Sequence, residues 1–287
     1  MNPYSYAAIP RNSTLKKQSP KILLMLQYLQ LVVLLLPMTQ SIAMGRPAQA
    51  VKSVHAASVA RLSAPTFSDT FEGGTLNADK WFIDTGRAPG NIPGVNSGTF
   101  NATHVDLSTG MLRLSLKQTV SGELATSTGA EIRSKPLLGY GTYVWVARAA
   151  STAETPNGTG SAVSGTVTDF FNFINDSETE IDFEYQGQSP GTLEMTNFST
   201  VSKSQATTTP VAGGESGFHE YKYLWSAGKI EFYVDGSLVS IHTQHIPSAP
   251  AAVLINLWGT NSGSFGGVAT NGVTRYLYVS SFSYTAP

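Results

Sequence analysis

Residues 178–185 read ETEIDFEY, and acidic and apolar side chains alternate from position 180 onward. Successive side chains of a β-strand point to opposite faces, so Glu180, Asp182 and Glu184 lie on one face of a strand. The other face carries the apolar side chains of Ile181, Phe183 and Tyr185. The segment therefore predicts a strand that buries one face in a core and presents a row of carboxylates on the other.

The crowding of these carboxylates needs a reason. Four of the chain's 19 acidic residues fall within positions 178–184. Neighbours on one strand face are only about 7 Å apart, so their like charges repel. A solvated strand face is the structural alternative, but Thr, Ser, Lys or Gln would serve it better. The pattern therefore favours a functional site, because charge crowding of this kind is typical of catalytic groups.

Retaining glycoside hydrolysis uses such a pair of carboxyl groups, about 5–5.5 Å apart across the scissile bond. One carboxylate attacks the anomeric carbon and the other, kept protonated, gives its proton to the leaving oxygen. The Cα atoms of Glu180 and Glu184 would be roughly 13 Å apart in an ideal strand, so the side chains must lean toward each other. Asp182 can share a proton or hydrogen bond with Glu180 and so help to keep the pair in different protonation states.

The rest of the chain also predicts strands. Short apolar-alternating segments recur between Gly, Asn and Ser turns, at residues 111–117, 141–148, 166–173, 180–185, 229–234, 238–242, 252–258 and 276–284. Asp235-Gly236 separates two of them and is a strong signal for a two-residue hairpin. No segment beyond the N-terminal leader keeps a helical period, and there is no internal repeat. The pattern predicts one all-β domain, a β-sandwich or barrel, over residues 66–287.

The composition excludes several classes of protein. The chain has 287 residues and no cysteine, so it has no disulfide framework, thiolate metal site or cysteine nucleophile. Residues 1–50 hold five of the 18 basic residues and none of the 19 acidic ones, which leaves the remainder with a net charge of −6. A domain of that sign is a poor partner for nucleic acid. A neutral substrate suits it better.

The N-terminus resembles an export signal. Lys16, Lys17 and Lys21 precede an apolar run, residues 22–38, and Ala48-Gln49-Ala50 provides a small-residue cleavage site. The alternative is a membrane anchor, although the run falls short of the about 20 apolar residues that a span needs. We expect residues 1–50 to be a signal peptide and residues 51–65, rich in Ala, Ser and Val, to be a linker. The domain is then secreted or periplasmic, with no stable membrane contact once the leader is cleaved.

The EIDFE sequence of residues 180–184 resembles the signature strand of glycoside hydrolase family 16. It matches the uninterrupted Glu-x-Asp-x-Glu form of the lichenase and xyloglucan endotransglycosylase branch, whereas laminarinases usually have one more residue before the last Glu. Further blocks in the family's order are GAEIRS at 129–134, GYGTY at 139–143, TVTDFF at 166–171 and INLW at 255–258. The resemblance implies a concanavalin-like β-jelly roll with a substrate cleft on its concave sheet.

The resemblance also implies residue roles. Glu180 would be the nucleophile, Glu184 the acid/base and Asp182 an assisting carboxylate. The substrate-binding residues would be Glu131, Arg133, Tyr140, Asn197, Asn256 and Trp258.

Structural alternatives remain open for most of the binding residues. Trp258 would stack on a sugar ring or pack in the core. Glu131 and Arg133 would contact sugar hydroxyls or form only a surface pair. Tyr140 is as much a packing residue as a cleft residue, and Asn197 would serve equally well in a turn.

The chain differs from lichenases at several positions. Glu178 and Thr179 stand where lichenases commonly have Trp and Asp, and Phe265 lies near the place of a second Trp. Ser280 and Ser281 occupy the region where many relatives have a calcium-binding Asp, so we expect no metal and no cofactor.

These observations predict a secreted, monomeric, retaining endo-β-glucanase that acts on β-1,3/1,4-linked glucans. Its partner would be the polysaccharide itself. The alternatives are a transglycosylase acting on β-glucan or xyloglucan, which shares the same strand, and a non-catalytic carbohydrate-binding jelly roll.

Overall fold

The structure is a computed structural model that describes residues 64–287. The predicted leader, residues 1–50, and most of the predicted linker, residues 51–65, lie outside the described residues. Within the described part there is a single 3-10 turn, Ala102–His104, and no helix long and apolar enough to cross a membrane. The strands are β1 (Phe67–Asp69), β2 (Trp81–Asp84), β3 (Gly86–Arg87), β4 (Asn96–Phe100), β5 (Val105–Asp106), β6 (Leu112–Ser121), β7 (Leu124–Ser134), β8 (Gly141–Ser151), β9 (Thr166–Ile174), β10 (Thr179–Gln186), β11 (Thr192–Thr200), β12 (Lys203–Pro210), β13 (His219–Ser226), β14 (Lys229–Val234), β15 (Ser237–His242), β16 (Ala252–Gly259) and β17 (Thr274–Thr285).

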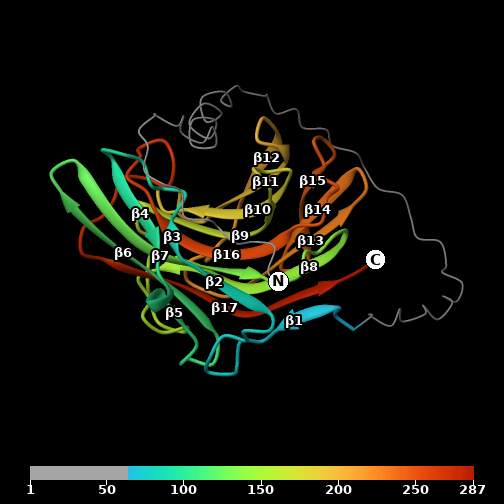
Figure 1. Ribbon diagram of the computed structural model, residues 1–287, viewed down its shortest axis with the longest axis horizontal. Helices are drawn as coiled ribbons and strands as arrows, with labels where there is room; N and C mark the ends of the chain where they lie inside the picture. Colours follow the sequence, from blue (N-terminus) through green and yellow to red (C-terminus); the bar gives the residue numbers. More distant parts are fainter. Residues whose placement is uncertain (1–63) are drawn as a thin grey trace, which may run out of the picture.

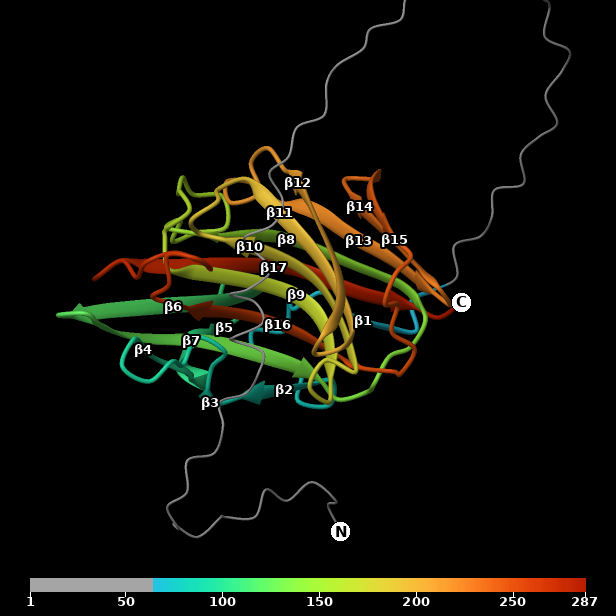
Figure 2. The same ribbon diagram turned by 90° about the horizontal axis from the view of Figure 1, so that it is seen from above.

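The strands form two curved layers. One layer has the order β2-β7-β16-β9-β10-β11-β12, and every neighbouring pair in it is antiparallel. The other runs β15-β14-β13-β8-β17-β6. Strands β1 and β17, from opposite ends of the described chain, lie side by side in this second layer (Figures 1 and 2). The predicted all-β jelly-roll sandwich is thus confirmed.

Strand β7 passes from one layer to the other. Its first half pairs with β6 and its second half pairs with β16 and β2. Gly129 lies at the crossing, where an added Cβ would come within 2.0 Å of the Leu257 carbonyl oxygen. Only glycine allows this close approach of backbone to backbone.

Aromatic side chains fill the space between the two layers. Trp145 and Tyr223 from the second layer meet Phe183 of β10, with ring centroids 6.2 Å and 5.9 Å from it. Ile181, Phe183 and Tyr185 all belong to this core, as the alternation of the EIDFEY segment predicts. The opposite face of β10 is thereby turned away from the core.

All eight strands predicted from alternation are present, with ends that differ by a few residues. The predicted hairpin is confirmed as well, because Asp235 and Gly236 have φ values of 49° and 77° between paired residues of β14 and β15. Strands β11 and β12 were not predicted. Their sequences, TLEMTNFST and KSQATTTP, contain few apolar residues. The more polar strand, β12, forms the edge of its layer.

Candidate active site

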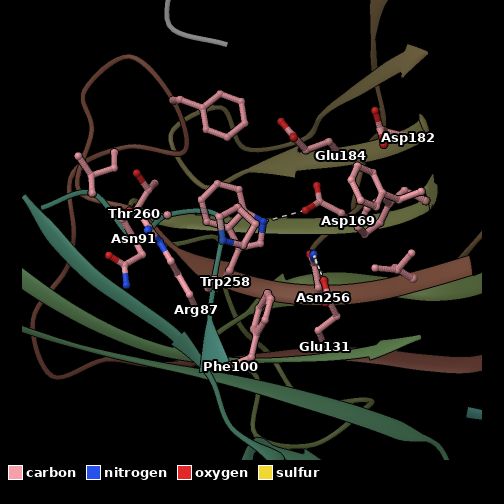
Figure 3. A pocket seen from close by; sticks show the side chains of 18 of the residues that line it. Arg87, Asn91, Phe100, Glu131, Asp169, Asp182, Glu184, Asn256, Trp258 and Thr260 are labelled. Carbon is pink, nitrogen blue, oxygen red and sulfur yellow. Dashed lines mark hydrogen bonds between the residues drawn. The ribbon is translucent and has the colours of Figure 1, made fainter. Parts of the chain in front are cut away.

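A cavity of about 490 Å³ opens on the face of the β2–β12 layer that is turned away from the core (Figure 3). Strands β7, β9, β10 and β16 form its floor, and residues 87–93 and 260–265 contribute to its wall. The three carboxyl groups of β10 all line it, and each residue is only 7–8% exposed. The cavity therefore brings Glu180, Asp182 and Glu184 together, as the sequence predicts.

A second row of polar groups crosses the floor at right angles to β10. Register pairs Glu131 of β7 with Asn256 of β16, Asn256 with Asp169 of β9, Asp169 with Glu184, and Glu184 with Glu194 of β11. Neighbours in such a row have Cβ atoms about 4.5–5.5 Å apart. Asp169, Glu184 and Glu194 are thus successive neighbours, Glu131 lies beyond Asn256, and Glu184 belongs to both rows.

Burial is the main influence on these carboxyl groups. It raises the pKa of Glu184 well above its usual value of 4.5, and the charges of Asp169, Glu194 and Asp182 add to the effect. Burial also raises the pKa of Asp169 and of Glu131 to about 7 each, against hydrogen bonds from Trp258 and Asn256 that lower them. Carboxyl groups of this kind keep a proton near neutral pH and can act as general acids.

Amide side chains hold the row in place. Nε2 of Gln186 donates to Oε1 of Glu184 at 2.8 Å and to Oε2 of Glu194 at 3.2 Å. Nδ2 of Asn256 donates to Oε2 of Glu131 at 3.0 Å (Figure 3). Each donor fixes the direction of a carboxyl group without adding charge.

Glu180 is held by the turn that precedes its strand. The hydroxyl of Ser177, a residue that is 1% exposed, donates to Oε2 of Glu180. Asn175, Asp176 and Ser177 have φ values of 44°, 47° and 66°, in the left-handed region that non-glycine residues seldom adopt. Strained backbone of this kind clusters at functional sites, where it places a side chain. Here it brings the Ser177 hydroxyl to the Glu180 carboxyl.

Apolar clusters lie on both sides of the polar row. One consists of Ala252, Leu254, Phe171 and Phe173 on β16 and β9. The other consists of Ala88, Phe100, Val167, Trp258 and Phe265. Sugar rings have an apolar face that matches surfaces of this type, so a chain of sugars can contact the floor on both sides of the carboxyl groups.

Trp258 both lines the cavity and packs against its neighbours. Its ring lines the cavity, yet it is 5% exposed and stacks on Phe265 with centroids 5.9 Å apart at 21°. Its Nε1 donates to Oδ2 of Asp169 at 2.8 Å (Figure 3). Gly90 lies against the ring, where an added Cβ would come within 2.8 Å. Packing thus holds the indole rigidly at the cavity wall.

Tyr140 and Asn197 do not line the cavity, which corrects two predicted substrate contacts. Tyr140 packs edge-on against Trp225 at 5.1 Å, next to the main core. Asn197 is fully buried, and its Nδ2 donates to the Gln244 and His245 carbonyl oxygens while its Oδ1 meets His242 at 2.7 Å. Asn197 is on the core face of β11 because Glu194 and Thr196, of the opposite parity, take the cavity face.

Arg133 has a structural partner. Its Nε and Nη2 donate to the two carboxylate oxygens of Asp84 at 2.7 Å and 3.0 Å, and its guanidinium lies 4.9 Å from the Phe82 ring centroid. It shares a strand face with Glu131 but does not line the cavity. Arg133 thus pairs with Asp84, and its charge also lowers the pKa of Glu131.

Sequence reasoning missed Asp169, Glu194, Gln186 and Ser177 as members of the site. Only Asp169 could have been found from the sequence, because it is a single acidic residue within an otherwise apolar strand segment, TVTDFF. Among residues 64–287, no group of three or more His, Asp or Glu side chains is arranged to hold a metal ion.

The raised pKa of Glu131 predicts a pH-dependent cost in stability. Between its unfolded value of 4.5 and its folded value of about 7, the folded protein binds more protons than the unfolded chain. Stability is therefore lost as the pH rises through this window, by up to about 3 kcal/mol. Glu131→Gln keeps an oxygen for Asn256 and does not titrate. We expect this variant to be more stable than wild type at pH 8, with a much smaller difference at pH 4.

Urea unfolding at both pH values measures this difference. The control is Glu231→Gln, which removes a carboxylate ion-paired with Lys229 at 3.2 Å in the other layer. It should give no gain at pH 8. An equal gain for Glu131→Gln at pH 4 and pH 8 would show that titration is not the cause.

Comparisons with known proteins identify the family of the chain. Residues 96–273 match the family described as glycosyl hydrolases family 16. The chain is 28% identical to endo-1,3-1,4-beta-glycanase ExoK of Rhizobium meliloti, over 69% of this chain and 70% of that protein. It is 28% identical to a beta-glucanase of Paenibacillus macerans, over 64% and 73%.

Solved structures share the fold. The Bacillus licheniformis beta-glucanase superposes with a TM-score of 0.65 at 24% identity, covering 79% of this chain and all of that one. A laminarinase catalytic domain from Thermotoga petrophila gives 0.61 at 16% identity, over 78% and 98%. The match of most of the described domain to one family, with that family's fold and a carboxyl-lined cavity on its concave face, places the chain among the glycosyl hydrolases of family 16.

Proposed function

We propose that the protein is a secreted, retaining endo-β-glucanase. The observation that supports this most strongly is the placement of Glu180 and Glu184 on one face of β10, on the floor of one cavity, with burial raising the pKa of Glu184. The relatives named as β-glucanases and as an endo-1,3-1,4-β-glycanase point to mixed-linkage β-glucan as the substrate.

In the proposed reaction, a carboxylate oxygen of Glu180 bonds to the anomeric carbon while the glycosidic bond breaks. Glu184 gives its proton to the leaving oxygen in the same step. Glu184, now a carboxylate, takes a proton from water, and the resulting hydroxide displaces Glu180 from the anomeric carbon. Each step inverts the configuration of the anomeric carbon, so the product keeps the configuration of the substrate. Asp182, between the two glutamates, assists through its charge, which is one of those that raise the pKa of Glu184.

The apolar clusters on both sides of the polar row favour cleavage within a polymer. Sugars on each side of the scissile bond can contact apolar surface, and a cavity of this kind does not require a chain end. Glu131, Asn256 and Trp258 line it and are the proposed contacts for the sugars.

A panel of polymers tests the proposal. Purified protein should release reducing ends from barley mixed-linkage glucan, with a rapid fall in viscosity that marks internal cleavage. Laminarin and xyloglucan serve as comparison substrates. Transfer of glucan fragments to a labelled oligosaccharide, without net release of reducing ends, would favour the transglycosylase instead. Binding of glucan with neither activity would favour the carbohydrate-binding module.

Export is a separate part of the proposal. The basic and apolar leader of residues 1–50 supports it, with cleavage after Ala50. N-terminal sequencing of protein recovered from outside the cytoplasm should begin at Val51. Recovery of the intact leader in a membrane fraction would favour the anchor.

A further inference from the structure

Asp169 is a buried carboxyl residue that the proposed reaction does not use. It is 7% exposed, lines the cavity and stands directly across from Glu184 on the neighbouring strand. Figure 3 shows it between the Glu184 carboxyl and the indole of Trp258. Its position next to the proposed acid/base suggests that it takes part in the reaction.

The two oxygens of Asp169 have different surroundings. Nε1 of Trp258 donates to Oδ2 at 2.8 Å, which fixes the orientation of the carboxyl group. Oδ1 is buried and meets no well-formed hydrogen bond among residues 64–287. Glu184 is paired in register with Asp169, and a hydrogen bond from its side chain lowers the pKa of Asp169. Asp169 thus holds an acceptor ready for a proton on Glu184.

Two adjacent carboxyl groups do not both ionise unless a cation compensates them. Within residues 64–287, the main groups that act on this pair are acidic or neutral. Glu194 from β11 and Asp182 from β10 add negative charge to the surroundings of Glu184, and Glu180 does so for Asp169. Asn256 and Gln186 are neutral. Arg87, which lines the cavity wall, donates to the Asn91 carbonyl oxygen at 2.8 Å.

We propose that Asp169 is a positioning residue that shares one proton with Glu184 and keeps this proton on the acid/base until the leaving oxygen takes it. The proposal rests on the proposed function, in which Glu184 is the proton donor. The O–H bond of Glu184 breaks as the O–H bond to the leaving oxygen forms, and water restores the proton in the second step. Asp169 gains and loses no proton over the cycle.

The charge of Asp169 is the largest electrostatic contribution that raises the pKa of Glu184, after burial itself. When Asp169 is ionised, its negative charge disfavours the ionised form of Glu184, so Glu184 stays protonated at higher pH. Removing that charge should lower the pKa of Glu184, so that it ionises at a lower pH.

Asp169→Asn tests this directly, because its amide oxygen still accepts from Trp258 while the charge is gone. We expect the alkaline limb of the kcat/KM profile to move to lower pH by about one unit or more. Activity above that limb then falls about tenfold, since each pH unit changes the protonated fraction tenfold. KM should not change. The control Glu231→Gln should leave the profile where it is in wild type.

Two results would overturn the proposal. An unmoved alkaline limb in Asp169→Asn would mean that Asp169 only supports Trp258. A raised KM with an unmoved limb would mean that Asp169 binds a sugar hydroxyl instead.

A measurement that needs no activity separates this proposal from the proposed function. Titration of ¹³C-labelled glutamate carboxyls by NMR, with Glu184→Gln to identify the resonance, gives the pKa of Glu184 directly. A lower value in Asp169→Asn than in wild type supports the coupling, and an equal value rejects it. If wild type degrades no glucan, the proposed function fails, but this titration still decides whether the two carboxyls share a proton.

Discussion

Replacing Glu180 with Gln should lower kcat on mixed-linkage glucan by about 10⁴-fold or more, as loss of a covalent nucleophile does in other enzymes. Gln has nearly the same shape, but its amide cannot form the glycosyl ester on which the second step depends. Gln can still accept the hydrogen bond from Ser177. The loss would therefore come from missing chemistry rather than from a disturbed fold.

Reducing-end release by wild type and Glu180→Gln measures this loss. Thermal unfolding of both proteins establishes that the variant is folded, and Glu231→Gln controls for removal of a carboxylate in general. Substantial activity in Glu180→Gln would mean that another carboxyl group attacks the anomeric carbon.

Glu184→Ala should behave differently, and the contrast separates the two roles. On natural glucan we expect a loss on the order of 10²–10⁴-fold, the usual contribution of general acid–base catalysis. An aryl glycoside with an acidic phenol as its leaving group needs no proton in the first step, so this substrate should still form the covalent intermediate. Breakdown of the intermediate is then slow because no base activates water.

Azide restores that second step, since it is an anion and needs no base. We expect added azide to accelerate turnover of the aryl glycoside by Glu184→Ala and to give a β-glycosyl azide. Azide should not rescue Glu180→Gln in the same way. An α-glycosyl azide from Glu184→Ala would contradict the assignment of Glu184, because it indicates single displacement.

The sequence predicted the part of the site that lies within one strand. Alternation in EIDFEY assigns three carboxyl groups to one face and three apolar groups to the core, and both assignments hold in the structure. Local periodicity cannot indicate which strands become neighbours. The pairing of Asp169 with Glu184 depends on the register of β9 against β10, and that of Glu194 on β11. The second row of polar groups, which crosses the floor at right angles to β10, therefore could not be predicted from the sequence.

The substrate contacts show the limit of assigning roles by resemblance. Glu131, Asn256 and Trp258 line the cavity, because they sit at cavity-facing positions of central strands. Tyr140 and Asn197 face packing partners instead. A cleft residue requires the right strand face. Tyr140 precedes β8, and Asn197 has the parity of the buried Leu193 and Met195, so the alternation in β11 places it on the core face.

The stereochemistry of hydrolysis tests the central claim most directly. ¹H NMR of mixed-linkage glucan during the first minutes of reaction distinguishes the two anomers of the new reducing end before they interconvert. Attack by Glu180 followed by attack of water predicts that the β-anomer appears first and the α-anomer grows later by mutarotation. Initial formation of the α-anomer would contradict a covalent intermediate on Glu180, and with it the roles assigned to both glutamates.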